Sequence, residues 1–263
     1  MRAAVRYVSC ALVILLWSGN ADTQSRFVFE GMWSDPPATP EGQACFPEFC
    51  TDVLLSRLNA LLDDPANDNR KFEDLRDEAT KYQQDTYIAP HLTAEALKTF
   101  PLDEADDPGF LHCEPWGAAR QIFGPHQLEI RQRGAGVIEM HYGEWDAKRT
   151  VYLEPRRAPI ASKPSRMGVS TARVEGGELV IQTTRIAANW TSYLALHSDQ
   201  LTIVERYTRS KDAKVLYLTA TFTDPVTLKE PVVLKKVWSW APNSKIAPYK
   251  DCQLPTGLVS KGR

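Results

Sequence analysis

The sequence predicts a mainly β fold for most of the chain, with a smaller helical part towards the N-terminus. From His126 onward, apolar and polar residues alternate with a period of two, which is typical of strands with one buried face. Glycine and Asp-Pro turn signals recur at strand-like intervals over the same region. Between residues 50 and 100, in contrast, apolar residues recur at spacings of three and four, which indicates helices.

Residues 1–21 have the features of a cleavable secretory signal. They contain a basic start, an apolar run too short to anchor the chain in a bilayer, and small residues at the end: Arg2 and Arg6, then 11–17, then Gly19 and Ala21. The alternative is a buried N-terminal helix. Cleavage predicts a mature chain that begins at Asp22, is periplasmic or secreted, and has no transmembrane anchor.

The composition favours one sizeable domain and argues against nucleic acid as a partner. The 263 residues carry 31 basic and 33 acidic side chains, for a net charge of −2, and loss of the signal makes the mature chain more acidic. An acidic chain lacks the basic surface that binds phosphate backbones. The division that we predict is 22–110 for a Pro-rich approach and an acidic helical segment, and 111–263 for the β domain.

The region 22–110 opens on a Pro-rich stretch at 35–40, which is expected to be extended because proline fixes φ and lacks an N–H donor. A helix follows over 53–62 and ends at Asp63-Asp64-Pro65. A second, more polar helix is expected near 70–84. A short third helix begins after Thr93 and is closed by Pro101.

Four cysteines remain after loss of the signal, in a compartment that permits oxidation: Cys45, Cys50, Cys113 and Cys252. Four cysteines allow three pairings, of which we favour a local Cys45–Cys50 loop and a long Cys113–Cys252 link across the β domain. A metal site is the weaker interpretation, since neither a second Cys-x-x-Cys nor a paired-His spacing accompanies Cys45 and Cys50. The sequence predicts no metal and no cofactor.

Eight strands account for the period-two region. They are expected at 127–131, 138–142, 149–154, 169–174, 178–184, 200–208, 214–223 and 232–240, with short turns between them. An antiparallel meander of this kind is predicted to close into a lipocalin-like or calycin-like barrel, because closure removes exposed strand edges. A two-sheet β-sandwich is the alternative.

A small barrel either fills its interior with side chains or holds one ligand, and the periodicity leaves both open. The candidate ligand-binding residues are aromatic side chains for apolar contact and arginines for polar anchoring: Tyr142, Arg149, Tyr152, Trp190, Arg206, Tyr207 and Trp238. Which of them point inward depends on register, because a shift of one residue reverses the face.

If the protein is an enzyme, the candidate proton-handling residues are Glu205, His141 and His197. Glu205 shares a strand face with Leu201, Ile203 and Tyr207, so an inward face would place a carboxylate among apolar groups and favour its protonated form. The alternative is an ion pair with Arg149 or Arg206. The run His197-Ser198-Asp199 contains the residue types of a hydrolase triad, but consecutive residues do not form its chain of hydrogen bonds.

Several segments resemble those of a widespread family of uncharacterised, secreted bacterial β-rich proteins. They are 107–117 with Cys113-Glu114-Pro115-Trp116-Gly117, the run 149–156, the run 168–180 and the run 197–207, within the C-terminal 150 residues or so. The departures are the helical stretch at 50–100 and Gln182, where relatives more often have an acid. The resemblance implies secretion and one β-rich domain, and it implies no established reaction.

Three functional hypotheses follow. The first is a periplasmic or secreted protein that binds a small hydrophobic or amphipathic molecule in a barrel pocket. The second is a cofactor-independent acid–base enzyme, such as a lyase, isomerase or hydratase, that acts on a similar molecule. The third is an envelope structural or interaction protein, which a solid barrel would favour. The sequence leaves the oligomeric state open.

Overall fold

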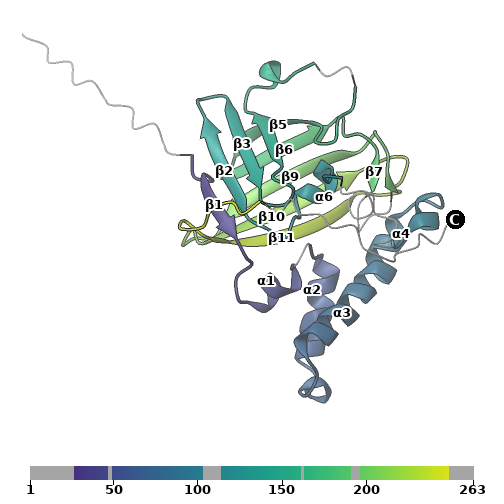
Figure 1. Cartoon of the computed structure of the whole chain (residues 1–263). Coiled ribbons are helices and arrows are strands. Elements are labelled where there is room, and N and C mark those ends of the chain that lie inside the picture. Colours follow the sequence, from purple (N-terminus) through teal and green to yellow (C-terminus); the bar gives the residue numbers. More distant parts are fainter. Residues whose placement is uncertain (1–26, 47–48, 103–113, 161–162, 191–195, 249–263) are drawn as a thin grey trace, which may run out of the picture.

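A computed structural model describes residues 27–46, 49–102, 114–160, 163–190 and 196–248. It shows a β-barrel with a helical hairpin beside it (Figure 1). The signal-like segment 1–21 lies outside the described residues. Within the described part, no helix combines the length and the apolar composition needed to cross a membrane.

Nine strands of the described chain close into a barrel, which confirms the predicted mainly β fold and the barrel rather than the sandwich. In barrel order they are β1 (Gly31–Ser34), β11 (Val232–Trp240), β10 (Val215–Thr223), β9 (Thr202–Arg209), β6 (Glu178–Thr184), β5 (Val169–Glu175), β4 (Lys148–Tyr152), β3 (Val137–Tyr142) and β2 (Leu128–Arg133). Eight of them lie where the alternation predicts strands.

The ninth strand, β1, comes from the N-terminal part rather than from 111–263. Trp33 of β1 pairs with Trp240 of β11 on one side and with Leu128 of β2 on the other, so β1 joins the two ends of the sheet. A strand of four residues is too short for a period-two pattern to stand out in the sequence. The barrel therefore needs a strand that lies outside the predicted β region.

The meander is also interrupted at two places. Strands β4 and β5 are parallel, with Val151 opposite Ser170, because the connection between them returns the chain to the barrel end from which β4 started. Strand β6 pairs directly with β9, and the segment between them forms a separate small hairpin of β7 (Asn189–Trp190) and β8 (Leu196–His197). Sequence alternation detects strands but does not report which strands become neighbours.

Side chains fill the described interior of the barrel. The inward positions of the strands carry large apolar residues that are at most 2% exposed: Ile130, Ile138, Met140, Val151, Leu179, Ile181, Ile203, Leu216, Leu218, Phe222, Leu234 and Trp238. A water-sized cavity beside these side chains would leave part of their surface accessible. The interior is thus packed, as small barrels can be.

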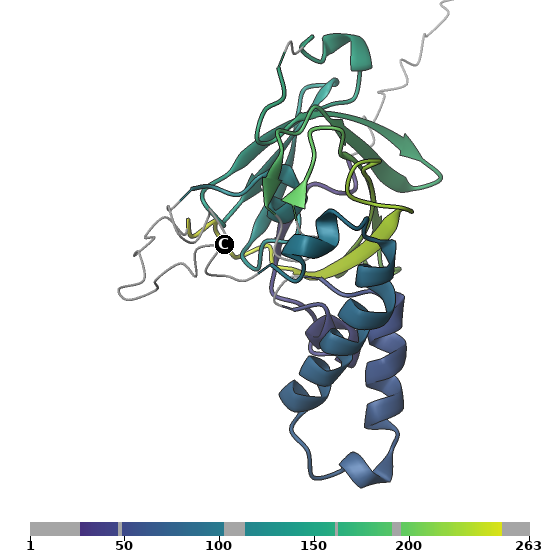
Figure 2. The same ribbon diagram turned by 90° about the vertical axis from the view of Figure 1, so that its right-hand side faces the viewer.

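The helical hairpin packs on the outer wall of the barrel. It consists of α2 (Asp52–Leu62), the turn η1 (Pro65–Asn67) and α3 (Phe72–Gln83), which continues through η2 (Gln84–Ile88) into α4 (Ala89–His91). Leu54, Leu58 and Leu75 form a second core, which includes the outward-facing Val237 of β11. From this base the hairpin projects away from the barrel (Figure 2). The predicted helical appendage is therefore present, close to its expected boundaries.

A disulfide between Cys45 and Cys50 is formed, as predicted. It connects α1 (Pro40–Ala44) to the start of α2. The backbone of Cys50 exchanges two hydrogen bonds with Lys235 of β11, at 2.9 and 2.8 Å, so the disulfide lies where the helices join the barrel. The predicted partners Cys113 and Cys252 lie outside the described residues.

Replacing both Cys45 and Cys50 by alanine is expected to lower the free energy of unfolding by about 2 kcal/mol. The loop that the disulfide closes is short, so the unfolded chain gains only a modest amount of conformational freedom when the link is lost. Urea unfolding followed by circular dichroism measures this change. As the control, the urea midpoint of the doubly substituted chain is compared between reducing and non-reducing buffer. A midpoint equal to that of the wild type would contradict the expectation.

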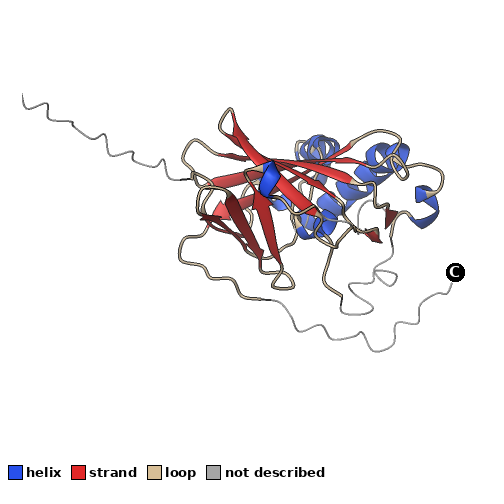
Figure 3. Cartoon of the chain, turned by 90° about the horizontal axis from the view of Figure 1, so that it is seen from above, coloured by secondary structure: helices blue, strands red, loops and turns tan. Residues whose placement is uncertain are grey.

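Short helices cover one end of the barrel, where β10 ends and β11 begins. Leu92 bridges to Leu228, and the Thr93 N–H donates to the Thr227 carbonyl oxygen at 3.0 Å, just before the turn η3 (Ala96–Thr99). After α6 (Ala118–Gln121), the Phe123 ring stacks on Phe222 of β10 with 6.0 Å between centroids. We call this the covered end. Viewed from above, helices lie along one side and at one end of the strands (Figure 3).

Candidate functional site

The barrel interior contains a polar cluster built on an ion pair between Arg149 of β4 and Glu205 of β9. The Nη2 and Nη1 atoms of Arg149 lie 2.6 and 2.9 Å from the Oε1 and Oε2 atoms of Glu205. Both side chains are buried, because residues 149 and 205 occupy inward positions of their strands. Two parallel N–H···O bonds of this kind form the strongest geometry for an arginine and a carboxylate.

Four hydroxyl groups complete the hydrogen bonding of this pair. Ser170 Oγ accepts from the guanidinium Nε at 2.8 Å, and Thr183 Oγ1 accepts from Nη2. The Tyr207 hydroxyl donates to the carboxylate Oε2 at 2.9 Å, and the Tyr142 hydroxyl lies 3.5 Å from the guanidinium Nη1. Ser170 and Thr183 are also 3.0 Å apart. The cluster therefore satisfies its buried charges from within the barrel.

The pKa shifts of Arg149, Tyr142 and Tyr207 keep these three groups in their ordinary charge states. Burial lowers the pKa of Arg149, but the adjacent carboxylate outweighs this effect and holds the pKa above its usual value. Burial raises the pKa of Tyr142 to about 12 and that of Tyr207 well above its usual value. The arginine stays charged and both phenols stay neutral over the physiological pH range.

Glu205 faces inward, and its oxygens are held by Arg149 and Tyr207. Of the two alternatives for an inward Glu205, a protonated acid or an ion pair, the structure contains the ion pair with Arg149. Arg206 points the other way, because neighbouring residues on a strand face opposite sides, and it pairs with Glu178 at 2.8 Å on the surface. Arg206 is therefore not an interior anchor.

The three proton-handling candidates are not brought together. Glu205 is inside the barrel, whereas His141 lies on the outward face of β3 and its Nε2 atom is 2.7 Å from Asp146 Oδ1. His197 lies on β8 at the covered end. In the described chain these residues form no acid–base pair with one another, since Glu205 hydrogen-bonds to Arg149, His141 to Asp146 and His197 to Ser198.

His141 shares its outward face with Glu139, as predicted, and lines an outer hollow of about 660 Å³ together with Glu129 and Trp240. Glu139 accepts a hydrogen bond from Arg133 at 3.0 Å, so it turns to a neighbouring strand rather than to His141. Among the described residues, no group of three His, Cys, Asp or Glu side chains is placed to hold a metal ion.

The aromatic candidates lie in different environments. Tyr142 and Tyr207 belong to the interior cluster, and Trp238 is buried inside the barrel with its ring 5.7 Å from the Lys236 Nζ atom. Tyr152 is only half-buried, at an outward position at the end of β4. The backbone of Trp190 forms part of β7, but its side chain lies outside the described residues. The described side chains of this set, those of Tyr142, Tyr152, Tyr207 and Trp238, therefore do not line one pocket together.

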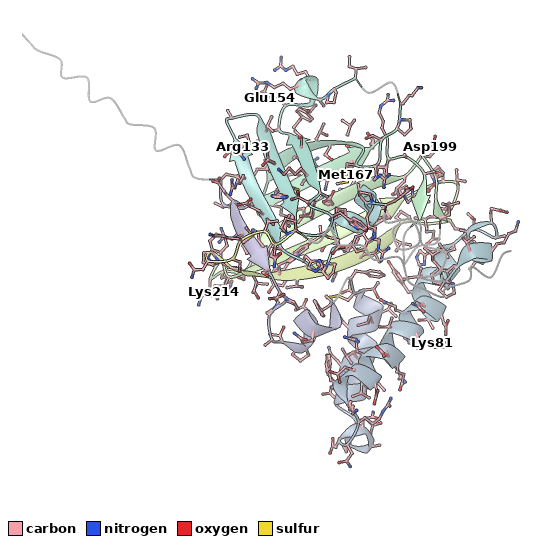
Figure 4. All side chains as sticks on the ribbon, in the orientation of Figure 1. Lys81, Arg133, Glu154, Met167, Asp199 and Lys214 are labelled. Carbon is pink, nitrogen blue, oxygen red and sulfur yellow. A yellow bond between two sulfur atoms is a disulfide. The ribbon has the colours of Figure 1, made fainter. Side chains whose placement is uncertain are left out.

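An apolar groove of about 650 Å³ lies at the covered end. It is lined by residues from η3, from the connections around β5, β6 and β8, and from the loop after β10, chiefly Ala96, Pro164, Ala187, Leu196, His197 and Val226. Asp199, at its edge, lies at the opposite side of the barrel from Arg133 and Lys214 in Figure 4. The volume falls within the range of about 300–1,000 Å³ that is typical of small-molecule sites.

His197 is the buried polar side chain of this groove, with 3% of its surface exposed. Its Nδ1 atom lies 3.0 Å from the Ser198 carbonyl oxygen, and its Nε2 atom has no hydrogen-bond partner within the described structure. Burial lowers the pKa of His197, and the hydrogen bond to the Ser198 backbone and the charge of Asp224 only partly oppose this effect. The imidazole is therefore neutral at pH 7.

Asp224 holds the groove wall in place. Its carboxylate accepts hydrogen bonds at 2.7 Å from both the Ser198 N–H and the Ser198 hydroxyl, and at 3.0 Å from the Val226 N–H. Burial raises the pKa of Asp224, but these hydrogen bonds outweigh it and hold the pKa below its usual value. An ionised Asp224 thereby ties the segment after β8 to the loop after β10.

Sequence reasoning missed Ser170, Thr183 and Asp224. Asp224 appears in the sequence only as the first residue of an Asp-Pro turn. The available signal is that an aspartate at a turn commonly accepts hydrogen bonds from nearby backbone N–H groups. Ser170 and Thr183 occupy inward positions of predicted strands, where a hydroxyl among apolar residues indicates a buried polar partner. Gln182 is exposed on β6, away from the interior cluster.

No protein-family model and no curated protein matches the chain. A similar solved structure is described as "a secretary abundant heat soluble (SAHS) protein from Ramazzottius varieornatus". It is 15% identical, with a TM-score of 0.30, over 46% of this chain and 76% of that one. The class that the fold defines, a closed β-barrel, rests on the strand pairing of this chain itself.

Proposed function

We propose that this protein binds a small amphipathic molecule in the apolar groove at the covered end of its barrel. The observation that carries the proposal is the groove itself, which is concave, mostly apolar and lined by a buried histidine with a free acceptor position. Pockets that bind small molecules combine an apolar wall with a few well-placed polar groups. The barrel serves as the rigid support for this end.

The packed interior favours the groove over the centre of the barrel as the binding position. Arg149 and Glu205 occupy the interior together with large apolar side chains, and their hydrogen bonds are already satisfied. A ligand in that place would have to displace a bidentate ion pair, and separating it leaves uncompensated buried charge. Binding at the groove leaves this network intact.

The expected location of the protein is the periplasm or the extracellular space. The signal-like segment 1–21 and the Cys45–Cys50 disulfide support this location, because disulfides persist in oxidising compartments. The resemblance to uncharacterised secreted bacterial β-rich proteins is consistent with the same proposal.

The test fills the groove from an exposed position. Ala188 lines the groove and is exposed, so Ala188→Trp places a large ring there with little effect on packing, and it is expected to weaken ligand binding at least tenfold. Ala66→Trp, at the exposed tip of the helical hairpin, is the matched control and should bind as the wild type does.

The measurement has two parts. Native mass spectrometry of the mature chain, purified without delipidation, looks for a co-purified small molecule, and titration with 1-octanol measures the affinity of the groove. A bound molecule that Ala188→Trp loses and Ala66→Trp keeps supports the proposal. A bare-chain mass together with no octanol binding, or equal binding by both variants, would overturn it.

A second candidate is an interaction role for the helical hairpin, which the packed barrel interior favours. The hairpin projects from the barrel, and its exposed surface is rich in acidic side chains, including Asp63, Asp64 and Asp74. A partner of this surface would be a basic protein. Native mass spectrometry of the same preparation separates the two roles, since a protein partner adds kilodaltons to the mass and a small ligand adds hundreds of daltons.

A further inference from the structure

We propose that the ligand of the groove carries a neutral hydrogen-bond donor, such as an aliphatic hydroxyl group, and that His197 Nε2 accepts this hydrogen bond. The inference rests on the proposed function and specifies the chemical class of the molecule that the groove takes. It assigns His197 as the residue that selects an alcohol over an ether or a carboxylate of the same length.

The hydrogen-bond partner of His197 determines which ring nitrogen carries the proton. The Ser198 carbonyl oxygen lies 3.0 Å from Nδ1, and a carbonyl oxygen has no hydrogen to donate. The Nδ1 atom must therefore carry the proton and donate it. In the neutral ring, the Nε2 atom is then left as an acceptor.

The Nε2 acceptor is buried and has no partner among the described residues. Buried acceptors are normally hydrogen-bonded, and an unmet one is unfavourable until a donor arrives. His197 lines the groove while its Nε2 atom is covered, so a hydroxyl group of a molecule in the groove reaches this atom when the side chains that cover it move aside. A ligand with an O–H or N–H group there gains a hydrogen bond that a ligand without a donor does not.

The charged groups around the groove argue for a neutral donor rather than an acid. Asp224 packs against the segment that carries His197, and the groove lining contains two carboxylates, Glu95 and Asp199, and one lysine, Lys163. A carboxylate ligand would bring a further negative charge and an acceptor towards the Nε2 lone pair. A hydroxyl group avoids both penalties.

The remaining groove surface suits an alkyl chain. Leu196 and Val226 at the groove are 39% and 44% exposed, and Ala96, Pro164 and Ala187 provide further apolar wall. Large apolar side chains that remain exposed around a concave surface mark binding sites more often than isolated ones do. The ligand class is thus an amphipathic molecule with an apolar chain and a hydroxyl group.

The experiment compares two isomers that differ only in the donor. We would titrate the mature chain with 1-octanol and with 1-methoxyheptane, which have the same atoms and nearly the same length, but of which only the alcohol has an O–H. At pH 7.5 the wild type is expected to bind 1-octanol about tenfold more tightly, which corresponds to one hydrogen bond. The ¹⁵N resonance of His197 Nε2 is expected to shift with the alcohol alone.

Two variants and a pH series identify the residue. His197→Phe should reduce the ratio of the two dissociation constants to about one. His91→Phe is the matched control, because His91 also places its Nδ1 atom against a backbone carbonyl, 2.6 Å from Tyr87 O, but lies outside the groove lining. It should retain the tenfold ratio. Lowering the pH until the His197 resonances report protonation should also abolish the ratio, since the charged ring has no acceptor, and this part needs no variant.

The outcomes separate this inference from the proposed function. If neither isomer binds, the groove is not a ligand site and both proposals fail. If both isomers bind with equal affinity and the His197 resonance does not move, the groove binds apolar molecules but His197 does not select the hydroxyl group. That result overturns the inference and leaves the proposed function in place.

Discussion

Replacing Arg149 by methionine is expected to lower the free energy of unfolding by about 3–5 kcal/mol. The substitution keeps most of the side-chain volume but removes every donor to Glu205 from β4. The carboxylate then remains buried beside the Tyr207 hydroxyl without a counter-charge. Removing one partner of a buried ion pair is costly mainly because of the charge that it leaves behind.

Urea unfolding monitored by near-ultraviolet circular dichroism measures this loss. Arg206→Met is the matched control. Arg206 is the residue after Glu205, it pairs with Glu178 on the protein surface, and its loss should cost about 0–1 kcal/mol. The double variant Arg149→Met with Glu205→Leu should recover a large part of the loss, because it removes both charges together. A loss below about 1 kcal/mol for Arg149→Met would show that the interior is more hydrated than its burial indicates.

Replacing Phe123 by alanine is expected to cost a similar amount, about 3–5 kcal/mol, through a cavity at the covered end. Phe123 is 1% exposed and lies between Phe49 and Phe222, at centroid distances of 5.7 and 6.0 Å. Its side chain thereby links the segment after α6 to the barrel core. The surrounding strands are held by the barrel ladder, so the space cannot close fully around a methyl group.

Thermal unfolding and amide hydrogen exchange test this second expectation. Tyr82→Ala, which removes an aromatic ring that is 44% exposed on α3, is the control and should cost less than about 1 kcal/mol. Exchange should accelerate first in α6 and at the end of β10 in Phe123→Ala, because these elements lose their common contact. Unchanged protection there would show that the covered end is held by other contacts.

Both expectations concern the scaffold beside the proposed groove. The interior ion pair stabilises the strands, and the covering helices and loops form the groove beside them. A rigid element that supports a variable end is a common way to build a binding site, since loops supply the contacts and the scaffold fixes their geometry.

The positions of the strands could be predicted from the sequence because alternation is a local property. Eight predicted strands coincide with barrel strands to within a few residues, and the turn at Gly176-Gly177 forms with φ values of +59° and +86°, as a tight hairpin requires. The helices and the Cys45–Cys50 link follow from spacings of three and four residues and from a short loop. The face shared by Glu205 and Tyr207 was predictable for the same reason.

The site could not be predicted in this way, because it depends on which segments become neighbours. Arg149 and Glu205 are 56 residues apart, and the parallel pairing of β4 with β5 and the direct pairing of β6 with β9 bring them together. His197 looked like part of a short polar run, and its buried position arises only when η3 and the loop after β10 pack beside it. By itself the sequence determined the local elements and which residues of a strand share a face. Tertiary packing alone decided the partners, the closed interior and the groove, because burial and hydrogen-bond completion depend on contacts between distant segments.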